Sequence, residues 1–98
     1  MKELNVEDFK NLKHGDRVYR FMNFQCRYLD FVGFMPRNEC YLIFCDGEYL
    51  TYLYINKKDN SFRGKWYSGQ YDAKLVGNLL RQQYLDEIKI IEEVYLND

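Results

Sequence analysis

The chain carries few of the groups on which enzymes depend. Its 98 residues contain one histidine, one threonine and two serines, and its acidic pairs are adjacent in sequence, so that on a helix or strand they point apart. The glycines are spaced too irregularly for a phosphate-binding loop, and the serines lack the motif of an activated nucleophile. We therefore expect no catalytic activity, no cofactor and no metal site.

Long hydrophobic runs are also lacking. The longest apolar stretches, residues 41–45 and 49–55, are far shorter than the roughly 20 residues that cross a bilayer. The N-terminus has Glu3 where a signal peptide has a basic start and an apolar run. Three cysteines, an odd number without close paired spacing, favour reduced thiols. These absences predict a cytoplasmic protein without a membrane segment.

Charge of one sign does not dominate, since the net charge is −1. Residues 10–81 nevertheless hold twelve lysines and arginines against seven acids, and both ends of the chain are acidic. A middle of mildly positive charge tolerates an acidic partner. It is well below the basic signature of a dedicated nucleic-acid-binding protein.

Aromatic side chains are abundant, at 18% of the chain, whereas alanine and proline each occur once, and this composition favours strands. Short aromatic and β-branched runs broken by turn residues predict five strands, over 16–22, 24–35, 39–45, 48–55 and 61–67. Before them, Asn5 is typical of a helix cap and Gly15 of a helix end near residue 13. The pattern predicts a helix followed by an antiparallel meander.

The turns predict which side chains share a face of the sheet. Asp46-Gly47 is the strongest hairpin signal, and it pairs Cys45 with Glu48, while a longer loop pairs Asn56 with Ser61. One face is then the core: Cys40, Leu42, Phe44, Tyr49, Thr51, Leu53, Ile55, Phe62, Gly64 and Trp66. The opposite face is half apolar and half polar: Tyr28, Asp30, Val32, Phe34, Tyr41, Ile43, Leu50, Tyr52, Tyr54, Arg63, Lys65 and Tyr67.

The turn at the single proline extends the core face. Pairing Met35 with Cys40 around it brings four residues to the core face, Leu29, Phe31, Gly33 and Met35. Because Gly33 has no side chain, it marks a point where the long strand could bend sharply to close a barrel.

The C-terminal part changes to helical spacing of its apolar residues. Asp72 is a plausible cap, so the pattern predicts a helix over 72–85 whose apolar stripe could cover part of the mixed face, including Ile43 and Leu50. Residues 88–95 are best interpreted as a final strand returning to the sheet, with a helix as the alternative. No repeat or linker is visible, so we expect residues 1–98 to form a single domain.

The stretch Leu12-Lys13-His14-Gly15-Asp16-Arg17-Val18 resembles the opening of SH3-like small β-barrels, and the likeness extends over residues 12–67. The resemblance implies a mainly β (α+β) fold: an antiparallel meander of five to six strands curling into a small barrel. Such barrels bind peptides, modified side chains or nucleic acid and rarely catalyse. This chain departs from them in having, besides its N-terminal helix, a full helix before the expected last strand.

The candidate binding surface is the face of the last predicted hairpin. It comprises Tyr52, Tyr54, Arg63, Lys65 and Tyr67, with Lys57 and Lys58 at the loop tip. In the predicted register Tyr54 faces Arg63 and Tyr52 faces Lys65. Cations beside aromatic rings offer stacking and phosphate contacts, but ordinary solvated cross-strand pairs are the alternative interpretation.

A second cluster lies on two adjacent predicted strands and contains Arg17, Tyr19, Arg20, Phe21 and Arg27. Alternation places Arg20 on the opposite side from Arg17, Tyr19 and Phe21, so the cluster is not one basic patch.

The sequence therefore predicts a small cytoplasmic, non-enzymatic binding module that contacts a protein partner through its tyrosine-rich face. Its composition also suggests a phage or mobile-element accessory protein, for example an inhibitor of a host enzyme. Nucleotide or single-stranded nucleic-acid binding through Arg63, Lys65 and the tyrosines is the alternative function. A homodimer through the same face is the third.

Overall fold

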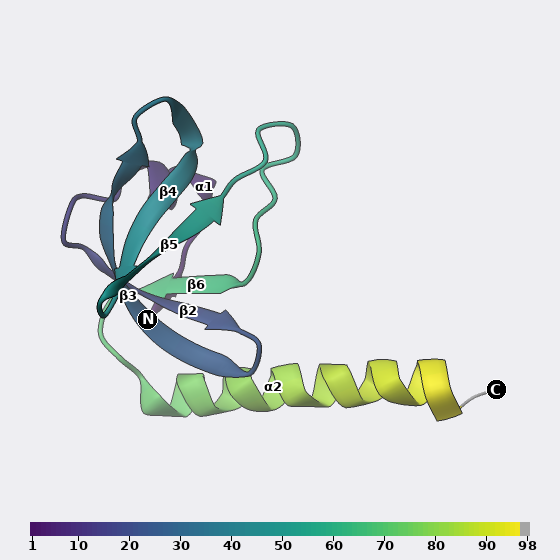
Figure 1. Ribbon diagram of the computed structural model, residues 1–98. Helices are drawn as coiled ribbons and strands as arrows, with labels where there is room; N and C mark the ends of the chain where they lie inside the picture. Colours follow the sequence, from purple (N-terminus) through teal and green to yellow (C-terminus); the bar gives the residue numbers. More distant parts are fainter. Residues whose placement is uncertain (97–98) are drawn as a thin grey trace.

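The fold is an antiparallel sheet of six strands with one short and one long helix, in a computed structural model that describes residues 1–96 (Figure 1). The strands are β1 (Lys2–Glu3), β2 (Arg17–Met22), β3 (Gln25–Met35), β4 (Asn38–Asp46), β5 (Tyr49–Tyr54) and β6 (Lys65–Ser68). The helices are α1 (Val6–Lys10) and α2 (Ala73–Ile91), and a π-helical turn, Glu92–Leu96, follows α2. Residues 97 and 98 of the expected single domain lie outside the described residues.

The sheet is open, with the strand order β1-β6-β2-β3-β4-β5. Its two edges are β1 and β5, so the predicted closure into a small barrel is wrong. The mainly β architecture, the antiparallel meander from β2 to β5 and the N-terminal helix are confirmed.

Helix α1 begins at the predicted cap. The Asp8 backbone N donates to Asn5 Oδ1 at 2.9 Å, and the Asn5 backbone N donates to Asp8 Oδ2 at 2.9 Å, which forms a reciprocal capping box. The bond from the Asn5 backbone, and then that from Lys2, lower the pKa of Asp8. The helix ends at Lys10, a few residues earlier than predicted.

We expect the Asp8→Asn variant to be less stable than the wild type at neutral pH, with a difference that shrinks in acid. Because the pKa of folded Asp8 lies below its ordinary value of 3.8, the ionised side chain stabilises the fold above that pH. This contribution is lost as the pH falls through the folded pKa. Urea unfolding over a pH series measures the effect, with Glu7→Gln in the same exposed helical turn as control. A difference that stays constant into strong acid would contradict the capping role.

The buried residues of β4 and β5 confirm the predicted core face of these strands, although the register differs and Tyr49, predicted to lie in the core, is exposed. Cys45 pairs with Leu50 rather than with Glu48, so the turn residues are Gly47 and Glu48. A shift of two residues leaves every side chain on its original face. The buried members of this core are Leu4, Phe9, Val18, Leu29, Phe31, Leu42, Phe44, Leu53, Ile55 and Trp66.

An irregularity in β3 changes the face of the residues that follow it. Phe31 pairs with Phe44, in the predicted register, but the pairing shifts before Gly33, where the sequence indicated a bend. Beyond the shift Phe34 pairs with Leu42 and contacts Phe31 edge-on, with ring centroids 5.4 Å apart. The prediction that Phe34 lies on the mixed face is therefore wrong.

The predicted strand over 61–67 is largely absent, and its hairpin with residues 48–55 does not form. Only the Asn56 to Ser61 backbone bond is present, at 3.0 Å, because Asn60 and Gly64 adopt left-handed conformations that turn the chain away. Strand β6 instead pairs with β2 and β1. This non-local pairing leaves β5 without a neighbour on one side.

The C-terminal segment is one long helix, so the predicted final strand over 88–95 is wrong and its helical alternative is right. Asp72 caps the helix by accepting from the Leu75 backbone N at 3.1 Å. Val76 of α2 packs with Phe21 and Tyr67 in a second core on the outer face of β2 and β6. Leu50 stays exposed, contrary to the expected covering of the mixed face. None of the helices in residues 1–96 is long and apolar enough to cross a membrane.

The far end of α2 extends past the sheet (Figure 1). The backbone N of Phe24 donates to Gln83 Oε1 at 3.1 Å, which ties the middle of the helix to the β2–β3 turn. Beyond it Ile90, Val94 and Tyr95 are exposed.

Candidate functional site

The seven predicted site residues do not form one surface. Tyr52 and Tyr54 of β5 and Arg63 of the following loop line a common groove. Lys57 lines a different pocket, and Lys58 is exposed in the loop. Lys65 lies opposite Phe21 in the β2–β6 pair, away from β5, and Tyr67 is buried against α2.

The predicted cross-strand pairs of Tyr52 and Tyr54 are wrong. Tyr54 pairs with Tyr41, with ring centroids 4.9 Å apart, and Tyr52 pairs with Ile43. Both tyrosines therefore have neighbours in β4, because β6 joins the other end of the sheet. The basic and aromatic residues of the predicted hairpin face meet only around the groove.

The groove runs between β5 and the segment from residue 61 to β6, with two side chains of β2 at its base. Its volume is about 400 Å³. Its lining residues are Arg20, Met22, Thr51, Tyr52, Leu53, Tyr54, Asn56, Ser61, Phe62, Arg63 and Trp66. No carboxylate is among them, whereas two arginines and several apolar side chains are, so the groove combines positive charge with apolar surface.

Arg20 spans the groove from its base. Its Nη1 donates to Thr51 Oγ1 at 3.4 Å, and its guanidinium lies 5.8 Å from the centre of the Trp66 ring. Partial burial lowers the pKa of Arg20. Within residues 1–96 the ion pairs include neither Arg20 nor Arg63.

The β5 edge beside the groove offers unpaired backbone groups. The Ile55 backbone N donates to the Cys40 carbonyl at 2.9 Å, and a two-residue turn joins Asp46 to Tyr49. In an antiparallel pair the direction of the backbone groups alternates along the strand. The N–H and C=O groups of Leu50, Tyr52 and Tyr54 therefore point away from β4, into the space beside β5.

An aromatic patch on the outer face continues from this edge. Leu50, Tyr52 and Tyr54 of β5 are about half exposed, and so is Tyr28 of β3. The Arg17 guanidinium lies 4.5 Å from the centre of the Tyr28 ring. Helix α2 packs against β2, β3 and β6, and the side chains of this patch are exposed.

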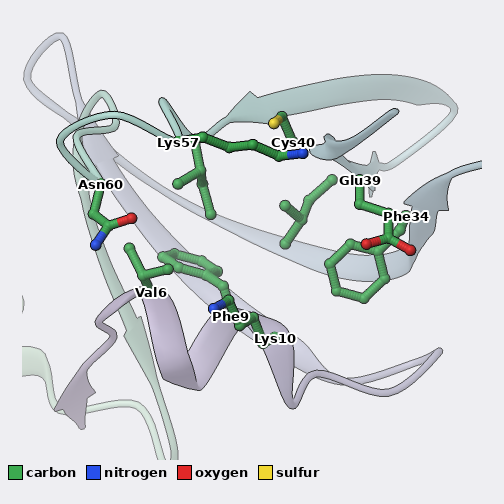
Figure 2. A pocket seen from close by; sticks show the side chains of 10 residues that line it. Val6, Phe9, Lys10, Phe34, Glu39, Cys40, Lys57 and Asn60 are labelled. Carbon is green, nitrogen blue, oxygen red and sulfur yellow. The ribbon is translucent and has the colours of Figure 1, made fainter. Parts of the chain in front are cut away.

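A second pocket lies against the inner core beside α1, and Figure 2 shows its lining side chains. Its floor is apolar, with Phe9, Leu42 and Ile55, and its volume is about 600 Å³. Lys57 and Glu39 both stand at the rim, so opposite charges face the opening. In the described part of the chain no cluster of three or more His, Cys, Asp or Glu side chains could hold a metal ion.

Sequence reasoning missed Arg20 as a member of the site. The predicted alternation did place Arg20 opposite Arg17, Tyr19 and Phe21, and the structure confirms this, since Phe21 lies under α2 while Arg20 reaches the groove. An arginine on the core side of a strand is costly to bury without a partner, and this was the available signal.

Comparison with family models, with curated proteins and with solved structures finds no match to this chain.

Proposed function

We propose that the protein is a non-enzymatic binding module that holds a protein partner along the β5 edge and the adjoining aromatic patch. The observation that carries this proposal is the free edge of β5. A strand edge with unpaired N–H and C=O groups is a template for an added strand from another chain.

Natural sheets protect such edges with charge, proline, bulges or short length. Strand β1, the other edge, has two residues, and both are charged. Strand β5 has six residues, none charged and none proline, and it pairs with β4 without a register shift. The contrast favours β5 as an edge kept open for a partner.

The aromatic patch supports the same partner. Tyrosine contributes a large, rigid contact area together with a polar tip, and it is enriched where proteins bind each other. Tyr52 and Tyr54 carry both features, because their backbone lies at the free edge and their rings lie on the outer face.

Replacing Tyr52 by proline tests the proposal. The substitution removes an outward N–H that β4 does not use, so we expect the fold to survive, as proline is tolerated at strand edges. Affinity purification with the tagged full chain from its native cells, followed by mass spectrometry, compares this variant with the wild type. We expect a protein that the wild type retains at raised salt and that Tyr52→Pro loses.

The matched control is Lys58→Ala, in the exposed loop beyond the edge, which should retain the partner. A partner retained equally by Tyr52→Pro would contradict binding at β5. Recovery of nucleic acid alone, with affinity that falls steeply as salt is added, would favour the nucleotide-binding alternative instead.

A further inference from the structure

We propose that the segment added to β5 carries an acidic side chain, which binds in the groove between Arg20 and Arg63. This inference rests on the proposed function and names the chemistry of its partner. It is carried by the charge of the groove together with its position beside the free edge.

The geometry of strand addition directs side chains into the groove. An added strand would lie about 4.8 Å from β5, and its side chains would alternate between the two faces of the sheet. Thr51 and Leu53 point from β5 toward the groove side. Side chains of the added strand on that same face would therefore enter the space above Arg20 and Trp66.

The arginines of the groove differ from the other arginines of the sheet. Arg17 pairs with Asp30 at 3.2 Å, and Arg27 pairs with Asp46 at 2.9 Å. Arg20 and Arg63 have no carboxylate within ion-pair distance among residues 1–96, and no acidic side chain lines the groove. The groove thus holds two guanidinium groups without an ion-pair partner among the described residues, although the charge of Asp46, which pairs with Arg27, also acts on Arg20.

A carboxylate fits this arrangement. The planar guanidinium group presents a fork of N–H donors that matches the two oxygens of a carboxylate. Arg20 makes one long bond, to Thr51, so most of its donors stay available. Phe62 and Trp66 beside it favour an extended segment in which apolar residues flank the acid.

A peptide-display selection on the immobilised full chain tests the inference. We expect the selected peptides to be enriched in Asp or Glu among apolar residues. A synthetic copy of a selected peptide should lose about tenfold in affinity when its acid is replaced by the neutral amide. Arg63→Glu should cause at least the same loss, whereas Lys58→Glu, an equal charge change in the neighbouring exposed loop, should change affinity less than about threefold.

NMR amide shifts separate this inference from the proposed function. Peptide binding that shifts the amides of Leu50, Tyr52 and Tyr54 without any selection for acid would overturn the acidic partner and leave β5 binding intact. Equal losses in Arg63→Glu and Lys58→Glu would also overturn it, because they would reflect net charge alone. Selected peptides that leave those amides unshifted would overturn both proposals. An oligothymidylate that binds in the groove and prevents the peptides from binding would also overturn both.

Discussion

Replacing Phe9 by alanine is expected to lower the free energy of unfolding by about 3–5 kcal/mol. Phe9 is 0% exposed and contacts the rings of Phe62 and Trp66 edge-on, at centroid distances of 5.2 and 5.7 Å. Helix α1 has five residues, too few to be stable alone, so it depends on this buried side chain. The substitution removes the ring and also leaves a cavity at the base of the inner core.

Urea unfolding monitored by circular dichroism measures this loss. Tyr49→Ala is the matched control, because Tyr49 is 77% exposed and the same aromatic-to-alanine change there should cost no more than about 0.5 kcal/mol. A loss below about 1 kcal/mol for Phe9→Ala would show that α1 does not hold the inner core together.

The second large effect is expected from Val76→Asp in the second core. Val76 is 6% exposed, and its side chain packs from α2 onto the outer face of β2 and β6, beside Phe21 and Tyr67. A carboxylate there would replace an apolar side chain packed among the apolar residues of that core, so burying it costs several kcal/mol or forces α2 off the sheet. We expect the variant to lose roughly 3–5 kcal/mol of stability.

The measurement is thermal and urea unfolding, compared with Asn78→Asp on the exposed side of the same helix. Near-wild-type stability in Asn78→Asp would show that the effect belongs to the buried position rather than to an added charge in α2. Similar stability in both variants would contradict the packing of α2 against β2 and β6.

Local patterns were sufficient to predict the faces of the central strands. Leu42, Phe44 and Leu53 lie in the core as expected, even though the β4–β5 turn is displaced, because a shift of two residues preserves alternation. The register shift of β3 lies next to Gly33, where the sequence predicted a bend, although the barrel that this bend was expected to close does not form. Both inferences depend on residues close together in the sequence.

Long-range pairing was not predictable in the same way. Residues 65–68 could pair with β5 or with β2, and alternation alone does not distinguish the two. The left-handed conformations at Asn60 and Gly64 turn the chain toward β2. Asn60 is not a glycine, so the sequence gives little indication of its left-handed conformation. For residues 88–95 the β-branched isoleucines favoured a strand, but these residues instead continue the helix that begins at the Asp72 cap.

For the candidate site, too, local features were predicted better than long-range pairing. Tyr52, Tyr54 and Arg63 line one groove, but Arg63 lies in a loop beside Trp66 and not on a strand paired with β5 as predicted. Their predicted pairing failed together with the hairpin, and Tyr67 proved to be buried under α2. Arg20 joins them from β2, and only the three-dimensional arrangement of the sheet brings it there.

Strands β2 and β6 lie between the two cores, which constrains how the sequence can diverge. Trp66 and Tyr67 are adjacent in the chain, and both are buried, on opposite sides of the sheet. Neutral drift in homologous chains should therefore be slow at the buried positions of these strands, Val18, Phe21, Trp66 and Tyr67. Strand β5, with every second side chain in solvent, is free to vary, so adaptation to new partners can proceed there without loss of the fold.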